Sequence, residues 1–296
     1  MKLSKKAFDV LVALAEAEGA LSQRRIGERT GLSPSTVNRQ LKELTESGFA
    51  KDGAITKRGI DALEPYAVKR AVFLAAGVGS RLLPITLNTP KPLVRVHGKQ
   101  MLDGLIEACC SIGIAEIYVV RGYLAEQFDQ LKYKYPAIRF IENPVYNETN
   151  NISSALAARD LLQNAYVFES DLILHNPKVL TKYHYSSDFL GVKVARSDDW
   201  CFTVKDGIIT EEKFGGLDCY QMVGISYWDA DSGKKLAEHI EAAYAMPGGK
   251  ERFWEQVPLS VFPKQYSVAI RPCELADVSE IDTLRELKQI DKTYDI

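Results

Sequence analysis

The chain has 296 residues, of which 46% are hydrophobic and 26% are charged. This composition is typical of a folded globular protein and excludes wholesale disorder, a collagen-like repeat and a disulfide scaffold. Lys and Arg (37) nearly balance Asp and Glu (39), so the chain as a whole is not a general binder of polyanions. Residues 1–70, however, carry 13 basic and 9 acidic side chains. A mildly basic head therefore precedes a mildly acidic body, which predicts two domains with different tasks.

The cysteines and histidines show none of the spacings that are typical of metal sites. We expect the five cysteines to be free thiols in a reducing compartment. No apolar run approaches the roughly 18 residues of a membrane-spanning helix. Acidic residues interrupt the first apolar segment, which therefore does not match a secretory signal. The sequence predicts a cytoplasmic protein that does not contact a membrane.

Residues 1–68 predict a small domain of helices followed by a hairpin. Apolar residues recur at helical spacing between residues 3 and 18, and two further helices follow the typical N-cap residues Ser22 and Ser33. Asp52 and Gly53 then predict a tight turn between two short strands. This order resembles the winged helix-turn-helix domains of bacterial transcription regulators.

The resemblance implies that the third helix of the head lies in the major groove of DNA. Its expected outward side chains are Ser35, Thr36, Asn38, Arg39 and Lys42. An excess of four positive charges is modest for a DNA reader. Winged helices also serve as dimerisation or docking modules, so the sequence leaves open DNA contact, a homodimer and docking to another protein.

Residues 69–296 follow without a flexible linker and predict an α/β domain. Short apolar runs alternate there with helical stretches. The expected strands are residues 71–75, 116–120, 138–142 and 165–170. This alternation predicts a Rossmann-like, mostly parallel sheet, which binds ligands at the carboxyl ends of its strands.

A glycine loop, LAAGVGSRLLPIT, begins in the first expected strand and is followed by PKPL. A dinucleotide loop would need a glycine at Leu82, and the Gly-Lys-Ser/Thr of a Walker loop is absent. Arg81 directly follows the loop, and Lys91 comes ten residues later. Two fixed cations with exposed amides suit a triphosphate whose α-phosphorus is attacked. The segment resembles the signature of nucleotidyltransferases of the sugar-1-phosphate type.

The resemblance implies that the chain binds a nucleoside triphosphate. Arg81 and Lys91 are the expected catalytic cations. Lys193 is the expected third catalytic cation, because it lies where the family carries an arginine. Arg196 is the alternative. The expected nucleotide-binding residues are Leu74, Ala76, Gly77, Gly79, Ser80, Arg81, Tyr123, Asn150, Asn151 and Ser154.

The pattern of residues 143–154 indicates which group of nucleotidyltransferases the chain resembles. Their pattern, N-x-x-Y-x-x-x-N-N-x-x-S, resembles that of bacterial CTP:phosphocholine cytidylyltransferases, as do the segments around the three tryptophans. The resemblance implies transfer of CMP from CTP to phosphocholine, giving CDP-choline and pyrophosphate. A quaternary ammonium needs an aromatic cage. The expected substrate-binding residues are Glu169, Trp200, Tyr227, Trp228, Trp254 and Glu255.

The resemblance also implies a Mg²⁺ site. Asp171 matches the second aspartate of the family's D-x-D pair, and Glu169 replaces the first. A later segment, ADVSEID, resembles another family motif and makes Asp277 the expected second metal ligand. An alternative register offers Glu280 and Asp282 instead. Two carboxylates completed by phosphate oxygens and water satisfy this hard ion.

Other functions stay open at this point. A related acceptor such as 2-aminoethylphosphonate carries a primary ammonium, which would favour a carboxylate over an aromatic cage. A sugar 1-phosphate is a further alternative acceptor. A different class of function is a DNA-binding regulator whose second domain senses a nucleotide. The intact Gly77, Arg81, Lys91 and Asp171 favour an active enzyme, because a sensor need not keep a metal carboxylate.

Overall fold

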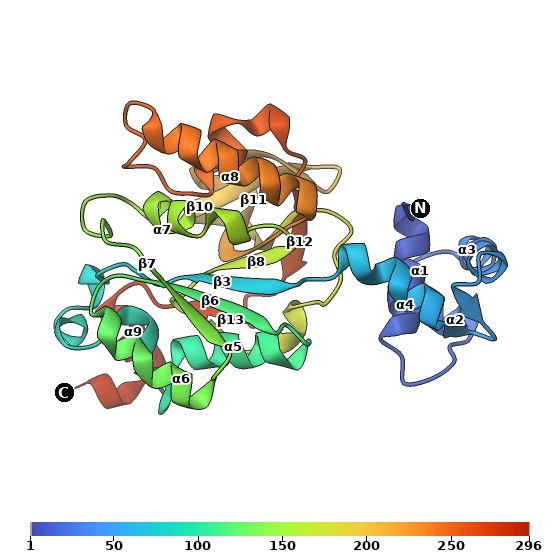
Figure 1. Ribbon diagram of the computed structural model, residues 1–296, viewed down its shortest axis with the longest axis horizontal. Coiled ribbons are helices and arrows are strands. Elements are labelled where there is room, and N and C mark those ends of the chain that lie inside the picture. The colour runs from blue at the N-terminus through green and yellow to red at the C-terminus, as the bar shows by residue number, and fades with distance from the viewer. Residues whose placement is uncertain (1, 296) are drawn as a thin grey trace. The chain divides into compact units, whose positions relative to one another are not determined.

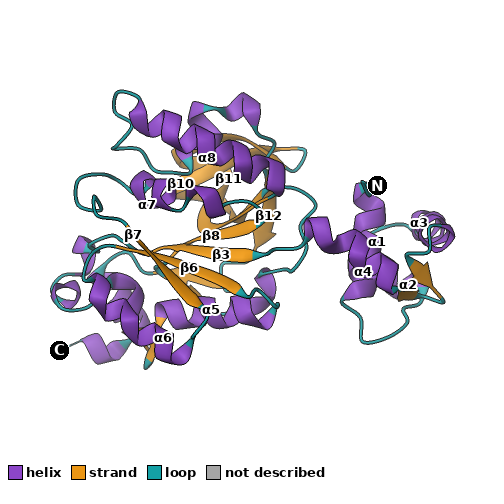
Figure 2. Cartoon of the chain, viewed as in Figure 1, coloured by secondary structure: helices purple, strands orange, loops and turns teal. Residues whose placement is uncertain are grey.

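The computed structural model describes residues 2–295 and divides into a head and a body (Figures 1 and 2). The head comprises the residues up to Ala67 together with Tyr183–Tyr185, and the body comprises the rest. Each unit has a hydrophobic core of its own. Among residues 2–295, no helix combines the length and the apolar character that crossing a bilayer requires.

The head has the winged helix-turn-helix order that the sequence predicts. Its elements are α1 (Lys5–Ala15), α2 (Gln23–Thr30), α3 (Pro34–Glu46), β1 (Ala50–Lys51), β2 (Ala54–Ile55) and α4 (Lys57–Leu63). Ser4, Ser22 and Ser33 accept backbone N–H bonds at the starts of the first three helices. The first helix is shorter than expected, because Ser4 caps it at Lys5 and the chain leaves the helix at Glu16.

Tyr183–Tyr185 complete the core of the head. The ring of Tyr185 stacks on Tyr66 with 5.9 Å between centroids, and its hydroxyl donates to the carbonyl of Leu3 at 3.1 Å. Ala67 pairs with Tyr183 in an antiparallel bridge. The sequence division at residue 68 assigns this segment to the body, because three residues so far along the chain give no sign of their packing partners.

The body is built on a seven-stranded sheet of order β10-β12-β11-β8-β3-β6-β7. Its strands are β3 (Arg70–Leu74), β6 (Glu116–Arg121), β7 (Ile138–Glu142), β8 (Ala165–Glu169), β10 (Asp188–Lys205), β11 (Ile208–Trp228) and β12 (Ala269–Cys273). β8, β3, β6 and β7 are parallel, and β10 is parallel to β12, whereas β11 is antiparallel to its neighbours. The predicted mostly parallel α/β sheet is confirmed.

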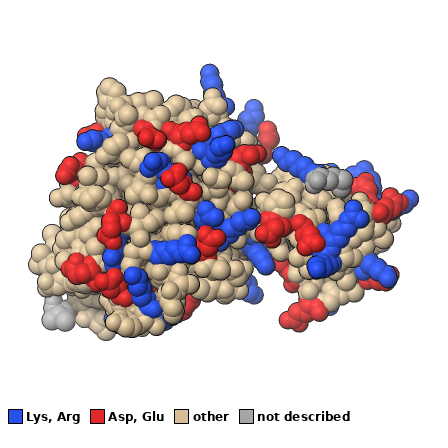
Figure 3. Space-filling view, in the orientation of Figure 1, with Lys and Arg blue, Asp and Glu red and all other residues tan. Residues whose placement is uncertain are grey.

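Helices cover both faces of this sheet (Figure 1). They are α5 (Met101–Ser111), α6 (Leu131–Lys134), α7 (Ile152–Ala157) and α8 (Ala230–Ala245). A further helix, α9 (Leu284–Ile290), packs in a separate apolar cluster with Leu82 and Met101. Because side chains alternate along a strand, Phe73 of β3 packs with Leu105 of α5 on one face. Val72 packs on the other face with Ile152 of α7 and Ile240 of α8. In Figure 3, basic and acidic side chains are interspersed over the visible face of the body, as the near balance of charge predicts.

Two pairings that the sequence does not reveal shape the pocket described below. β10 and β11 form a long antiparallel hairpin in which Trp200 lies opposite Phe214. Two short strands, β9 (Leu172–Leu174) and β13 (Val278–Glu280), pair so that Glu280 lies opposite Leu172. A further two-stranded hairpin joins β4 (Arg95–Val96) to β5 (Lys99–Gln100). The β9–β13 pair thus brings a carboxylate from the end of the chain beside the end of β8.

Candidate active site

A cavity of about 700 Å³ opens at the carboxyl ends of β3 and β8. Its walls come from the glycine loop, from residues 143–154, from the β10–β11 hairpin and from two later segments. Fourteen of the residues expected from the sequence line it: Leu74, Ala76, Gly77, Gly79, Ser80, Arg81, Lys91, Asn150, Asn151, Ser154, Glu169, Asp171, Trp200 and Glu255. The location agrees with the rule for parallel sheets.

Gly79 holds the glycine loop against the segment that carries Lys91. Its φ of 65° lies in the left-handed region, which favours glycine. A Cβ atom there would lie 2.8 Å from the Cβ of Lys91 and 3.2 Å from Thr86. The Thr86 hydroxyl donates to the Gly79 carbonyl at 2.9 Å. The loop is therefore fixed at a distance from Lys91 that no larger residue permits.

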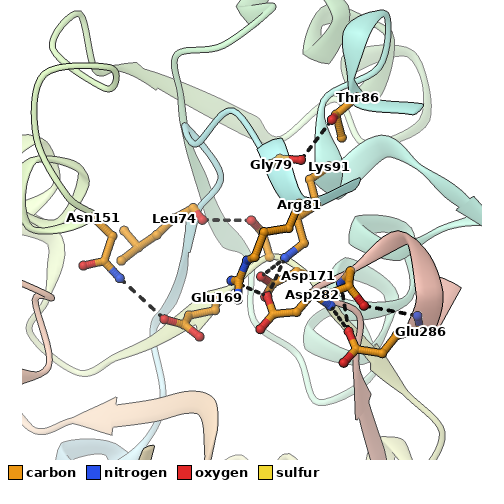
Figure 4. Close-up of polar contacts among 12 residues, drawn as sticks. Leu74, Gly79, Arg81, Thr86, Lys91, Asn151, Glu169, Asp171, Asp282 and Glu286 are labelled. Carbon is orange, nitrogen blue, oxygen red and sulfur yellow. Dashed lines mark hydrogen bonds and ion pairs between the residues drawn. The ribbon is translucent and has the colours of Figure 1, made fainter. Parts of the chain in front are cut away.

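Four charged side chains meet at the centre of the pocket (Figure 4). Lys91 Nζ donates to Asp171 at 2.7 Å and to Asp282 at 2.9 Å, and Arg81 donates to Asp282 at 2.7 Å. Lys91 is only 8% exposed, and burial alone would lower the pKa of its ammonium. The charges of Asp171 and Asp282 outweigh burial and raise that pKa. Lys91 therefore stays positively charged where it can meet phosphate oxygens.

Three carboxylates beside this cluster are suited to a divalent cation. Glu169, Asp171 and Glu280 each place an oxygen within 4.8 Å of the others. Asp171 Oδ1 is buried and accepts no hydrogen bond from residues 2–295. Burial raises the pKa values of Glu169 and Glu280 well above the usual range, and neighbouring carboxylates raise them further. The donor set fits Mg²⁺, which prefers carboxylate and phosphate oxygens.

Residues 143–154 form a hydrogen-bonded frame on the next wall. Asn143 is 2% exposed, and its amide donates to Ser153 at 2.9 Å and to Ser154 at 3.0 Å. Asn151 accepts from the backbone N–H of Trp254 at 2.8 Å and donates to Glu169 at 3.5 Å. Asn151 therefore links this wall both to the carboxylate of Glu169 and to the segment that follows α8.

Three aromatic rings form an aromatic wall (Trp200, Phe214 and Phe253) at the remaining side. The Trp200 ring packs edge-on against Phe214 at 5.9 Å and against Phe253 at 5.7 Å, measured between centroids. Glu255 lines the same pocket and is 2% exposed. Burial raises the pKa of its carboxyl to about 8, and its Oε2 has no hydrogen-bond partner among residues 2–295. Rings and a buried carboxylate together are suited to an organic cation.

Comparison with known proteins gives two family matches. A model described as nucleotidyl transferase matches residues 70–189, and one described as the IclR helix-turn-helix domain matches residues 5–52. The 2-aminoethylphosphonate cytidylyltransferase of Lancefieldella rimae is 38% identical over 76% of this chain and 92% of the relative. The choline-phosphate cytidylyltransferase of Streptococcus pneumoniae is 31% identical over 75% and 97%. The chain belongs to the nucleotidyl transferase family.

A solved structure agrees with this assignment. The CTP:phosphocholine cytidylyltransferase from Streptococcus pneumoniae has a TM-score of 0.68 and 29% identity, covering 77% of this chain and 99% of that one. The body is thus a nucleotidyltransferase of the cytidylyltransferase type, and the head is a helix-turn-helix domain. Both expectations from the sequence are confirmed. The two relatives are named for different acceptors, so the acceptor is a separate question.

Three aromatic residues that the sequence assigns to substrate lie instead in the core of this nucleotidyltransferase. Tyr227 and Trp228 are 0% exposed, and Trp254 is 3% exposed. Trp228 packs with Trp254 and Phe189, at 6.0 Å between centroids in both cases. These residues do not line the pocket, because the apolar interior between sheet and helices takes the largest side chains.

Two expected charged residues also lie outside the pocket. Lys193, on the exposed side of β10, forms an ion pair with Asp218 at 2.8 Å. Asp277 belongs to the turn before β13, where it accepts from Asn176 and from the backbone of Glu274, at 2.8 Å each. The alternative register, with Glu280 and Asp282, is the one that reaches the pocket.

Tyr123 does not line the pocket but is hydrogen-bonded to the glycine loop and to the segment that follows it. Its hydroxyl donates to the Thr86 carbonyl at 2.8 Å, and its backbone N–H donates to Ala76 at 3.0 Å. Sequence reasoning missed Phe214, Phe253 and Asp199, which all line the pocket. Phe253 directly precedes Trp254 within the family-like segment RFWE, and that neighbourhood is the signal that could have found it.

Proposed function

We propose that this cytidylyltransferase transfers CMP from CTP to 2-aminoethylphosphonate and releases pyrophosphate. The choice of this acceptor rests on one observation. Glu255 Oε2 is buried without a hydrogen-bond partner among residues 2–295, in a pocket that has an aromatic wall. A primary ammonium offers three N–H donors and a full positive charge, so it suits both the carboxylate and the rings. The 38% identity to a 2-aminoethylphosphonate cytidylyltransferase supports the proposal.

Phosphocholine is the second candidate, and the aromatic wall favours it. A trimethylammonium group donates no hydrogen bond but makes cation–π contacts with several rings at once. Trp200, Phe214 and Phe253 supply three such rings. The relative from Streptococcus pneumoniae that is named for choline phosphate supports this candidate. Glu255 would then neutralise the cation without a hydrogen bond.

The proposed reaction needs no general base. An oxygen of the acceptor is already anionic at neutral pH, and it attacks the α-phosphorus of CTP. The bond from that phosphorus to the bridging oxygen of the β-phosphate breaks, and pyrophosphate leaves with the electron pair. We assign CTP to the walls formed by residues 74–81 and 143–154. Lys91 and Arg81 then exchange part of their contact with Asp282 for phosphate oxygens, which stabilises the transition state.

We propose Mg²⁺ as the cofactor, with Asp171 and Glu280 as its ligands and Glu169 beside them. The ion would neutralise charge on the phosphates that separate. Because each ligand must be ionised to bind, the raised pKa values of Glu169 and Glu280 imply weaker metal binding at acidic pH. A chelator should abolish turnover, and added Mg²⁺ should restore it. Asp171→Asn should require much more Mg²⁺, whereas unchanged turnover at low Mg²⁺ would remove Asp171 from the site.

The deciding experiment measures pyrophosphate release for each nucleotide and acceptor. The purified protein is incubated with CTP, UTP, GTP or ATP and with 2-aminoethylphosphonate, phosphocholine, phosphoethanolamine or glucose 1-phosphate. We expect the highest kcat/KM for CTP with 2-aminoethylphosphonate. A preference for phosphocholine would select the second candidate, and a preference for glucose 1-phosphate would refute both.

We propose that the head contacts DNA through the outward face of α3. Ser35, Asn38, Arg39 and Lys42 are exposed on this helix, and Lys51 is exposed on the hairpin. The fit to the IclR helix-turn-helix model supports this role. Fluorescence anisotropy with a labelled duplex should show binding that weakens with salt. The double substitution Arg39→Ala and Lys42→Ala should reduce the logarithmic salt slope by about two. No binding at 50 mM salt would contradict the proposal.

We propose the cytoplasm as the location of this reaction. All five cysteines are free thiols in the structure. Free thiols are usual in reducing compartments. Detection of the activity in the soluble fraction of lysed cells would test the assignment.

A further inference from the structure

Glu212 is a buried carboxylate that lies beside the pocket without lining it. On the β10–β11 hairpin it pairs with Phe202, while Trp200 and Phe214 form the pair two residues away. Residues two apart on a strand share a face, so Glu212 lies on the same face of the hairpin as two rings of the aromatic wall. It is 8% exposed. A charged residue at such a position is costly unless it is paired and hydrogen-bonded.

Glu212 is also bonded to the segment that carries Glu255. Its Oε2 accepts from the Ser260 hydroxyl at 2.8 Å. Ser260 belongs to a π-helical turn, Val257–Val261, that starts two residues after Glu255. Turns of this kind are often found at functional sites. The two carboxylates are thus held by neighbouring parts of one segment.

Neither carboxylate has a counter-ion among the described residues. Glu212 Oε1 and Glu255 Oε2 are both buried without a hydrogen-bond partner in residues 2–295. Over the same residues, neither side chain forms an ion pair with Lys or Arg. Burial raises the pKa of Glu212 to about 7, and burial followed by the charge of Glu212 raises that of Glu255. Two adjacent buried acids without a cation are suited to a ligand that brings one.

We propose that Glu212 is a specificity-determining residue that acts through Glu255 and selects acceptors with a cationic group. The inference rests on the proposed function, in which an ammonium lies between Glu255 and the aromatic wall. In a site of low dielectric constant, a second fixed carboxylate adds to the attraction of that ammonium. An uncharged acceptor of the same shape leaves two buried acids uncompensated, and it is rejected for that reason.

The test compares two acceptors that differ only at one group, an ammonium in the first and a methyl in the second. 2-Aminoethylphosphonate and n-propylphosphonate have nearly the same shape, but only the first carries an ammonium. Their kcat/KM ratio is measured at pH 8.5, where Glu212 is ionised, for the wild type and Glu212→Gln. We expect the substitution to reduce the ratio about tenfold, through a higher KM for 2-aminoethylphosphonate. The KM for CTP and the kcat/KM for n-propylphosphonate should stay within about twofold.

Two control variants separate charge from structure. Glu211→Gln removes the same charge from the adjacent exposed residue, which bonds Lys213 and Thr203, and should leave the ratio unchanged. Ser260→Ala removes the hydrogen bond but keeps the Glu212 charge, and should keep most of the preference. If Ser260→Ala reproduces the loss, or if Glu212→Gln retains the full ratio, the role of Glu212 is refuted. If the wild type releases pyrophosphate with neither acceptor, the proposed function fails and the inference fails with it.

Discussion

The two ends of the pocket are built in different ways. At the phosphate end, Gly79, Arg81 and Lys91 come from one short stretch of chain directly after β3. At the acceptor end, the rings of the aromatic wall come from three separate stretches of chain: Trp200 from β10, Phe214 from β11 and Phe253 from the segment after α8. Related enzymes that catalyse the same reaction can keep the sequence of this single loop. The residues of the separate segments can be substituted one at a time to fit another acceptor.

The electrostatics of the two ends also differ. The cations at the phosphate end are already paired, because Asp171 and Asp282 accept from Lys91 and Arg81. At the acceptor end, Glu255 is buried without an ion pair in the described chain. Under the proposed function, the phosphate end would exchange one partner for another when CTP binds, while the acceptor end would gain its first cation from the ligand. Changes at the first end should affect kcat, and changes at the second should affect KM.

The largest effect is expected from Lys91→Met. It removes the positive charge from the phosphate end and leaves Asp171 and Asp282 without their partner, so kcat should fall by about 100- to 1000-fold. Steady-state pyrophosphate release measures this loss. The matched control is Lys193→Met, which the structure places outside the pocket and which should keep kcat within about twofold. An equal loss in both variants would restore Lys193 to the catalytic set.

A smaller loss is expected from Asp282→Asn. Asp282 accepts from both Arg81 and Lys91 and holds them at the phosphate end, so kcat should fall about 10- to 100-fold. Asp277→Asn is the matched control, since the Asp277 side chain bonds Asn176 and Glu274 outside the pocket. Single-turnover rates with saturating CTP distinguish the two variants. The reverse ranking would show that the register with Asp277 is the functional one.

At the acceptor end, Trp200→Ala should act on KM. Cation–π contact with a desolvated ammonium contributes about 2 kcal/mol, which corresponds to roughly a 30-fold rise in KM for the acceptor. The KM for CTP should change little. Initial rates with each substrate varied in turn measure both constants. Similar rises for CTP and acceptor would mean that Trp200 supports the pocket as a whole.

The smallest effect concerns stability and pH. Burial raises the pKa of Glu212 from 4.5 to about 7, so the folded state binds more protons than the unfolded state between these values. The wild type should therefore lose free energy of unfolding as pH rises from about 4.5 to 7. Glu212→Gln lacks this loss and should gain about 1–2 kcal/mol relative to the wild type between pH 5 and pH 6.5. Urea unfolding at both pH values measures the difference, and parallel pH profiles would contradict it.

The location of the residues at the phosphate end could be predicted from the sequence because these residues are contiguous. The loop around Gly79, Arg81 and Lys91 follows a buried strand, and the chemistry of each residue type can be deduced from that order. The acceptor end depends on strand pairing: Phe214 meets Trp200 only because β11 turns back on β10 in one register. From residue type alone, Trp228 is a better candidate than Phe214 for binding the acceptor. In the structure, however, Trp228 is buried in the core.

The shared core of the head has a consequence for protein synthesis. Tyr66 and Phe8 pack against Tyr185, which the ribosome adds more than a hundred residues after Ala67. N-terminal domains generally fold first during translation. In this chain, however, β3 to β9 are synthesised before Tyr185, the last aromatic residue of the head's core. A nascent chain that stops before residue 183 leaves Phe8 and Tyr66 without that ring. Completion of the N-terminal domain is therefore timed by the synthesis of the enzyme that follows it.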